Sequence, residues 1–186
     1  MRLDIQALPI PDVKLIRTSR IADVRGYFCE TYARPAFFEH DLDYDFVQDN
    51  QSSSARAGTI RGLHFQQPPF AQAKLVRVLN GKILDVVVDL RRSSASYGQH
   101  VAIELGDADD EQLLVPPGFA HGFCTLEPNT VVLYKVDAVY SAAHDRGLNW
   151  ADPKLAINWP VTAENAVLSD KDRKLPMFDE LTPAFD

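Results

Sequence analysis

Two histidines in the middle of the chain are the first candidates for chemistry. His64 lies in the run Arg61-Gly62-Leu63-His64-Phe65-Gln66, and His121 lies in Pro116-Pro117-Gly118-Phe119-Ala120-His121. A neutral imidazole accepts a proton near neutral pH, so either side chain can serve as a general base. A single histidine on a strand is more often a core residue with satisfied hydrogen bonds, and the sequence around each one does not decide between these roles.

Residues 116–121 also have the pattern Pro-x-Gly-x-x-His, the second half-motif of the metal-binding cupin barrel. The first half-motif normally supplies His-x-His and a glutamate as ligands, and here His64-Phe65-Gln66 takes its place. Glutamine is a poor metal ligand, and two histidines fall short of the three good ligands that a metal site usually needs. The residues therefore argue against a metal site and disfavour a metal-dependent oxygenase.

The composition describes the protein that must position these residues. The chain has 186 residues, 46% hydrophobic and 24% charged, which is typical of one globular domain over residues 1–186. Lys and Arg number 19 against 26 Asp and Glu, a net charge of −7. Without a basic surplus, nucleic acid is not an expected partner, whereas a small anion needs only two or three local cations.

Targeting signals are missing from the sequence. No apolar stretch reaches the roughly 18 residues of a membrane span, so no membrane partner is expected. Residues 1–16 carry Asp4 and Asp12 and lack the apolar core of a signal peptide. Cys29 and Cys124 have no metal-type spacing and are expected to be reduced thiols. The expected location is the cytoplasm.

Short strands separated by turn residues dominate the middle of the chain. Strands are predicted at residues 59–66, 74–79, 82–89, 100–105, 111–115, 123–126 and 131–140. This number and spacing predict an all-β sandwich or barrel. Residues 35–41 form the one candidate helix, and the Pro-rich stretch after Trp150 is expected to wrap the barrel as loops and short turns.

The pair Asn80-Gly81 predicts a hairpin between residues 74–79 and 82–89, because a type I′ turn needs positive φ at both central residues. The facing pairs are then Leu79 with Lys82, Val76 with Asp85, and Lys74 with Val87. Alternation places one set on a common face: Lys74, Val76, Val78, Ile83, Asp85, Val87 and Asp89. The charged members are either solvated at a strand edge or paired in a polar pocket inside the barrel, and the pattern leaves both open.

A run of motifs in a fixed order resembles one known family. The matching segments are residues 23–30, 46–54, 61–66, 74–77, 85–91, 117–123, 133–135 and 169–172. Their order and spacing, nearly end to end, are similar to the dTDP-4-dehydrorhamnose 3,5-epimerase family. Each motif alone is weak evidence, but eight in order make chance agreement negligible.

The resemblance implies a fold, a substrate and an assembly. The fold is a jelly-roll, cupin-like β-barrel with a few short helices and no metal. The substrate is a nucleoside diphosphate 4-keto-6-deoxy sugar inverted at C3 and C5, and no cofactor takes part. The protein is a homodimer with sites shared between protomers.

The resemblance also assigns catalytic roles. His64 corresponds to the base, Asp172 to the residue that orients it, Tyr134 to the acid and Lys74 to the cation that steadies the enolate. These residue types suit an epimerisation. The C4 ketone makes the hydrogens on C3 and C5 acidic, so a base can remove them, and inversion then needs a proton returned to the opposite face of the sugar. From the residues alone, Tyr134 can equally line the barrel, Lys74 can pair with Asp85, and Asp85 can replace Asp172 as the partner of His64.

Further positions match the substrate-binding residues of the family. They are Arg25, Phe28, Glu30, Gln48, Asn50, Arg61, His121 and Tyr140. Arginines suit a diphosphate and flat rings suit stacking. The N-terminal third is expected to reach the partner's site. His121 is expected to support the pocket and not to catalyse.

One tension concerns Arg61 and His64, which are assigned to one ligand. Strict alternation puts them on opposite faces of their strand. A bulge at Gly62 would reconcile them, because an isolated glycine in a strand often marks one. Otherwise Arg61 reaches around the rim of the barrel, or its assignment to this ligand is wrong.

Three functions are consistent with the sequence. The leading one is the cofactor-independent 3,5-epimerase. An epimerase acting at C5 only or C3 only keeps the histidine and the barrel, and the presence of Tyr134 favours activity at C5. A non-catalytic nucleotide-sugar-binding cupin would be expected to lose the base or the acid, and this chain keeps both.

Overall fold

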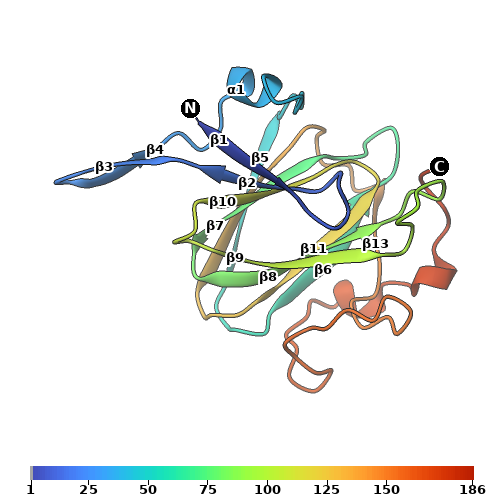
Figure 1. Cartoon of the computed structure of the whole chain (residues 1–186). Helices are drawn as coiled ribbons and strands as arrows, with labels where there is room; N and C mark the ends of the chain where they lie inside the picture. Colours follow the sequence, from blue (N-terminus) through green and yellow to red (C-terminus); the bar gives the residue numbers. More distant parts are fainter. Residues whose placement is uncertain (1) are drawn as a thin grey trace.

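The computed structural model describes residues 2–186 and is an all-β barrel built from two antiparallel sheets (Figure 1). The larger sheet has the strand order β1 (Leu3–Ala7), β2 (Lys14–Thr18), β10 (Glu111–Val115), β7 (Lys74–Asn80), β12 (Thr130–Val136) and β5 (Gln48–Ser54). The smaller sheet has the order β13 (Asp145–Gly147), β6 (Ile60–Gln66), β11 (Phe119–Thr125), β8 (Lys82–Asp89) and β9 (His100–Gly106). The predicted jelly-roll barrel is confirmed.

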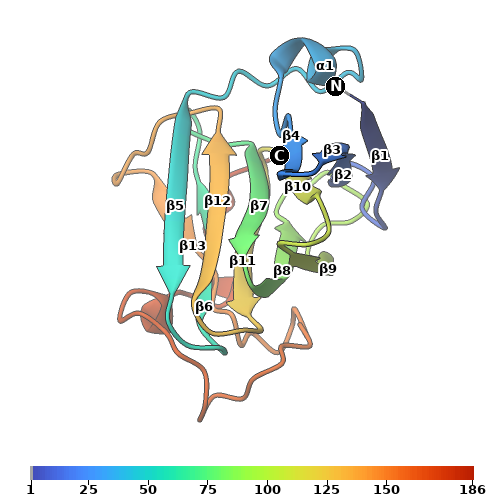
Figure 2. The same ribbon diagram turned by 90° about the vertical axis from the view of Figure 1, so that its left-hand side faces the viewer.

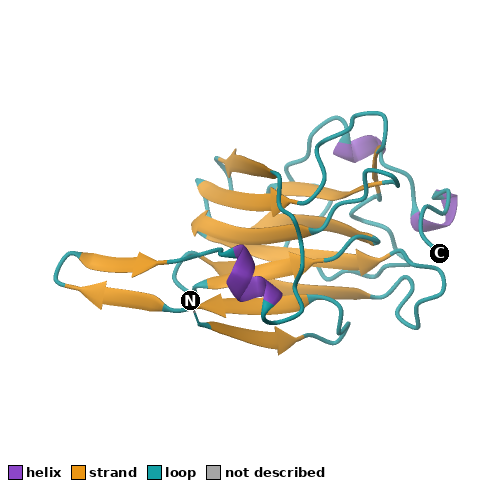
Figure 3. Ribbon diagram, turned by 90° about the horizontal axis from the view of Figure 1, so that it is seen from above, coloured by secondary structure: helices purple, strands orange, loops and turns teal. Residues whose placement is uncertain are grey.

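A two-stranded arm projects from the barrel (Figures 1 and 3). It consists of β3 (Arg20–Asp23) and β4 (Gly26–Cys29), which pair only with each other in the described part of the chain. The short helix α1 (Arg34–Phe38) follows it, begins with proline in its first turn and buries Phe37. No helix within residues 2–186 has the length and apolar character to cross a membrane.

The C-terminal part packs against the outer face of the smaller sheet, and in Figure 2 its orange and red loops are seen mainly below the strands. It contains two single turns of 3-10 helix, η1 (Asp172–Lys174) and η2 (Phe178–Glu180). Leu155 and Phe178 pack there against Leu63 and Val86 of the sheet. The predicted wrapping by loops and short turns is confirmed.

The main core lies between the two sheets and consists of alternate side chains from their strands. Val76 and Val78 enter it from β7, and Ile83 and Val87 enter it from β8. Because successive side chains on a strand point to opposite faces, the other half of each strand faces outward.

The predicted hairpin is wrong, because its two strands lie in different sheets. Side chains of the predicted common face, such as Val76 and Ile83, still meet in the core between the sheets. β7 pairs with β10 and β12, whereas β8 pairs with β11 and β9. Residues 80 and 81 therefore carry the chain from one sheet to the other, and the predicted register does not exist. Gly81 has φ +82°, and a Cβ on it would lie 2.6 Å from the Oγ1 of Thr130. Residue 81 must be glycine because β12 approaches it so closely. The sequence of the turn does not indicate this contact.

Several other strand limits differ from the prediction. The strand expected at residues 123–126 begins at Phe119, and the one expected at 131–140 ends at Val136. The strands expected at residues 59–66, 100–105 and 111–115 are observed within one residue of their predicted limits.

A bulge in β6 is the local feature that shapes the barrel interior. His64 pairs with His121 and Arg61 pairs with Phe123, so β6 advances three residues where β11 advances two. The bulge predicted at Gly62 is therefore confirmed. Gly62 has φ +115°, and a Cβ on it would lie 2.7 Å from the Cα of Gly122. Only glycine fits this close contact between the two backbones.

We predict that Gly122→Ala destabilises the protein. The new Cβ would lie 2.6 Å from the carbonyl oxygen of Arg61, which is backbone and cannot turn away. The free energy of unfolding, measured in urea, should fall by about 1–3 kcal/mol. Gly106→Ala is the control, because the one atom within 3.0 Å of its Cβ would be the Oδ2 at the end of the exposed Asp109 side chain. Equal stability of the two variants would contradict the tight approach of β6 and β11.

Candidate active site

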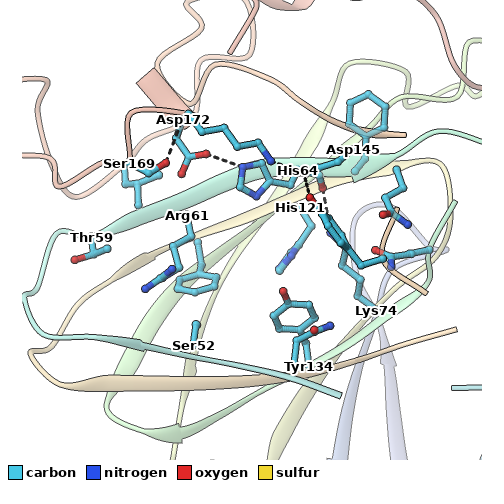
Figure 4. Close-up of a pocket in the computed structure, with 18 of the residues that line it drawn as sticks. Ser52, Thr59, Arg61, His64, Lys74, His121, Tyr134, Asp145, Ser169 and Asp172 are labelled. Atoms are coloured by element: carbon cyan, nitrogen blue, oxygen red, sulfur yellow. Dashed lines mark hydrogen bonds and ion pairs between the residues drawn. The ribbon is translucent and has the colours of Figure 1, made fainter. Parts of the chain in front are cut away.

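A cavity of about 550 Å³ opens between the two sheets. Side chains from β5, β6, β7, β11 and β12 line it, together with residues 167–169, Lys171 and Asp172 of the C-terminal segment (Figure 4). This volume lies in the range of cavities that hold small organic ligands.

His64 and Asp172 form a hydrogen-bonded pair at the cavity wall. The Nε2 of His64 lies 2.6 Å from the Oδ1 of Asp172, across 108 residues of sequence. The backbone N–H of Asp172 donates to the Oγ of Ser169, which anchors the start of η1. Burial raises the pKa of Asp172, but hydrogen bonds and the charge of His64 outweigh it and lower the pKa overall. Asp172 is the partner of His64, and the alternative pairing with Asp85 is wrong.

His121 has a carboxylate partner of its own. Its Nε2 lies 2.9 Å from both carboxylate oxygens of Asp85, which is fully buried. His121 neighbours His64 across the β6–β11 pair, and its ring also lines the cavity. Asp85 is therefore paired inside the barrel and is not solvated at a strand edge. Asp89 is also paired, but with Arg91, Ser94 and Ser96 away from the cavity.

Lys74 is a buried cation beside the histidines. Its Nζ donates to the carbonyl oxygen of His64 at 3.0 Å. Burial lowers the pKa of Lys74 to about 8, and the charges of Asp85 and Asp145 partly oppose that shift. The lowered pKa of the Lys74 ammonium group is thus much closer to neutral pH than that of an ordinary lysine.

Tyr134 faces the same cavity from the other sheet. It lies on β12, and its hydroxyl points into the cavity in Figure 4. Burial raises the pKa of Tyr134, and the nearby charge of Arg61 offsets part of the rise. A phenol with a raised pKa stays protonated near neutral pH and can donate that proton. Since His64 lies on β6, the two side chains approach a ligand from opposite walls.

The bulge brings Arg61 to the cavity together with His64. The Arg61 Nε donates to the Oγ of Ser54 at 3.1 Å, and its Nη2 donates to the carbonyl oxygen of Ser53 at 2.9 Å. These bonds hold the guanidinium group along β5. A fixed guanidinium is a suitable ligand for phosphate oxygens.

Three other predicted binding residues also line the cavity. Gln48 and Asn50 lie on β5, and the Nε2 of Gln48 donates to the Oδ1 of Asn50 at 2.8 Å. Tyr140 lies at the mouth with 59% of its surface exposed, and its hydroxyl donates to Asp145.

The arm residues are not brought to this cavity. Arg25 is exposed and pairs with Asp23, and Phe28 is 66% exposed. Glu30 follows β4 and likewise lies outside the residues that line the cavity. Within one chain, residues 2–186 therefore leave these three predicted contacts unmade.

The sequence prediction missed several cavity residues. The Oγ of Ser52 is buried in the cavity wall and has no hydrogen-bond partner among the described residues. Alternation along β5 from Gln48 and Asn50 is the signal that could have identified it. Asp145 and Lys171 form an ion pair at the mouth. Asp145 has no signal in the sequence, whereas Lys171 lies inside a matching motif.

The site residues include no arrangement suited to a metal. Within residues 2–186, no group of three or more His, Cys, Asp and Glu side chains is placed to hold a metal ion. What the arrangement offers is a carboxylate-bound imidazole, a buried ammonium, a phenol on the opposite wall and a guanidinium. Together these groups suit proton transfer on an anionic ligand.

Comparisons with known proteins give one consistent family. The family model described as dTDP-4-dehydrorhamnose 3,5-epimerase matches residues 7–180. A dTDP-4-dehydrorhamnose 3,5-epimerase of Sinorhizobium fredii is 52% identical over 180 residues, with 97% of this chain and 92% of the relative covered. The Escherichia coli enzyme of that name is 42% identical over 174 residues, with 92% of each chain covered.

Solved structures give the same result. The dTDP-4-dehydrorhamnose 3,5-epimerase of Bacillus anthracis, crystallised with TDP and PPi, superposes with a TM-score of 0.91 at 50% identity, covering 95% of this chain and 99% of that chain. The epimerase of Legionella pneumophila in complex with dTDP-4-keto-L-rhamnose has a TM-score of 0.92 at 35% identity, covering 97% of this chain and 95% of that chain.

We predict that one lysine of the folded protein titrates at about pH 8, because burial lowers the pKa of Lys74. An NMR titration of protein carrying ¹³C-labelled lysine should show this signal, and Lys74→Met should remove it. Asp85→Asn should move its midpoint to lower pH, because Asp85 favours the charged form. If every lysine titrates near the ordinary value of about 10.4, the described environment of Lys74 is wrong.

Proposed function

This chain belongs to the dTDP-4-dehydrorhamnose 3,5-epimerase family, and we propose that four side chains of its cavity carry the reaction, namely His64, Asp172, Tyr134 and Lys74. The enzyme is an isomerase that inverts C3 and C5 of a dTDP-linked 4-keto-6-deoxy sugar. The observation that carries the assignment of residues is the placement of His64 and Tyr134 on opposite walls of one cavity.

His64 is proposed as the base. The hydrogens on C3 and C5 lie next to the C4 carbonyl and are acidic, because the carbanion delocalises onto the carbonyl oxygen. The Nε2 of His64 faces Asp172, so its Nδ1 is the nitrogen that accepts the proton. The carboxylate fixes this tautomer and stabilises the imidazolium that forms.

Lys74 is proposed to stabilise the enolate. Its ammonium group lies beside the base and is held by the carbonyl oxygen of His64. A fixed donor aimed at a developing oxyanion in a dry site is typically worth about 3 kcal/mol. The nearby charges of Asp85 and Asp145 help Lys74 to stay charged despite its burial.

Tyr134 is proposed as the acid. After His64 removes a proton from one face of the sugar, inversion requires a proton delivered to the other face. Tyr134 stands on β12 of the larger sheet, whereas His64 stands on β6 of the smaller one. The phenol gives its proton to the carbon; His64 then releases its proton to solvent and solvent returns one to Tyr134 before the second inversion.

Arg61, Gln48 and Asn50 are proposed to hold the diphosphate and the nucleoside, with Ser52 added to the set. His121, held by Asp85, supports the cavity wall. Tyr140 offers its exposed ring for stacking at the mouth.

We further propose a homodimer in which the arm enters the partner's cavity. The arm exposes four apolar side chains, namely Ile21, Val24, Tyr27 and Phe28. Such a surface on a free monomer is unfavourable in water. Arg25 and Phe28 would then complete a site that each chain alone leaves open, and Glu30 at the end of the arm would join them.

Charge supports the same assembly. The cavity lining contains three cations, Arg61, Lys74 and Lys171, of which Lys171 is paired with the carboxylate of Asp145. A diphosphate therefore meets little net positive charge within one chain. Arg25 of the partner subunit would supply an additional cation once the diphosphate replaces Asp23 as its counter-ion.

The cytoplasm is the proposed location, and neither nucleic acid nor a membrane is a proposed partner. Cys29 and Cys124 are both unpaired, as expected for a reducing compartment. The net charge of −7 opposes binding to a phosphate backbone.

We predict deuterium exchange at both C3 and C5 when the protein acts on dTDP-4-keto-6-deoxyglucose in D₂O, followed by NMR. His64→Ala should slow exchange at both carbons by a factor of about 10² or more. Tyr134→Phe should leave exchange into the substrate but reduce the inverted product, because deprotonation survives without the acid. His40→Ala, at an exposed position, is the control.

The outcomes separate the alternatives. Exchange at one carbon alone would identify an epimerase with a single site of action. No exchange by folded protein that still binds dTDP would identify a binding protein instead. Full activity of His64→Ala would overturn the assignment of the base.

The shared site has its own test. Two inactive variants, His64→Ala and the double variant Arg25→Ala with Phe28→Ala, are unfolded together in equal amounts and refolded. Mixed dimers should contain one intact site, so activity per chain should recover to about a quarter of wild type. If the arm serves its own chain, every site keeps a lesion and the mixture stays inactive.

A further inference from the structure

The segment of residues 137–141 reaches the cavity without regular structure. It lies between the end of β12 and the start of β13 and presents Tyr140 at the mouth. The hydroxyl of Tyr140 donates to the Oδ2 of Asp145 at 3.1 Å. Backbone outside helices and sheets must find other hydrogen-bond partners, and these partners determine how firmly the segment is held.

Three glutamine side chains supply those partners. The Nε2 of Gln72 donates to the carbonyl oxygen of Ala138 at 2.7 Å. The Oε1 of Gln48 accepts from the backbone N–H of Tyr140 at 3.1 Å. Gln66 bonds to the residues on both sides of Tyr140 and so lies at the centre of the set.

Three backbone groups bond to the amide of Gln66 and engage both of its donors. Its Oε1 accepts from the N–H of Ser141 at 2.6 Å, and its Nε2 donates to the carbonyl oxygens of Val139 at 3.2 Å and Phe70 at 2.7 Å. The residue is only 4% exposed. With both donors and the acceptor engaged, Gln66 has no donor left for a ligand, although it lines the cavity two residues after His64.

We propose that Gln66 is a positioning residue that fixes residues 139–141, so that the ring of Tyr140 is preorganised to stack on the nucleotide sugar. This rests on the proposed function. The position that carries a metal ligand in metal-binding cupins thus serves substrate affinity through a backbone segment. Residues ordered before binding cost no conformational entropy when the ligand arrives, so the effect belongs to binding and not to proton transfer.

The test is a double-mutant cycle between Gln66 and Tyr140, read by calorimetric binding of dTDP and by the kinetics of deuterium exchange. Gln66→Met keeps the size of the side chain and removes all three hydrogen bonds. It should raise the Kd for dTDP about tenfold and leave kcat within about twofold. Tyr140→Ala should raise Kd similarly, and the double variant should bind no more weakly than Tyr140→Ala alone.

Matched variants guard against a general loss of structure. Gln67→Met is the control, because only the backbone of Gln67 makes hydrogen bonds in residues 2–186, and it should bind dTDP like wild type. If Gln66→Met does not fold, Gln72→Met tests the same coupling through the one bond to Ala138.

The failures are distinguishable. Additive effects of the two substitutions, an unchanged Kd in Gln66→Met, or a fall in kcat at constant Kd would each overturn the positioning role. A wild-type protein that neither binds dTDP nor exchanges deuterium would instead overturn the proposed function.

Discussion

The close approach of Gly62 to Gly122 is the constraint around which the site is built. The contact lets β6 carry an extra residue opposite β11, and Arg61 and His64 then both line the cavity. Without the bulge, the period of two in a strand would turn Arg61 to the other face. The remaining groups are placed relative to this strand: Lys74 donates to the His64 carbonyl, and the C-terminal segment delivers Asp172 to the imidazole.

The need to pair buried charged groups is the second constraint on the site. A carboxylate inside a barrel is costly unless it is paired and hydrogen-bonded. Asp172 meets His64, Asp85 meets His121, and Asp145 meets Lys171 and Tyr140. These pairs fix the positions of the proton-transfer groups inside the barrel, and one of them also pairs the cation Lys171 with a carboxylate.

Much of this could be read from the sequence, and the limits have physical causes. Runs of strand-forming residues bounded by turn residues identified β6, β9 and β10, because turn chemistry at their ends is a local signal. The hairpin prediction failed because Asn80-Gly81 reports local turn chemistry, whereas Gly81 is required by the distant Thr130. The pairing of His64 with Asp172 came from the family resemblance, since a contact across 108 residues leaves no local signal. The hydrogen bonds of Gln66 were beyond prediction, because they depend on backbone groups and not on residue types.

A crystal structure with an unreactive dTDP-linked 4-deoxy analogue of the sugar tests the central claim most directly. The account predicts one ligand molecule contacted by both Arg61 and His64, within about 3.5 Å, with Tyr134 on the opposite face of the sugar ring. A ligand that reaches only one of Arg61 and His64, or that meets Tyr134 and His64 on the same face of its ring, would contradict it.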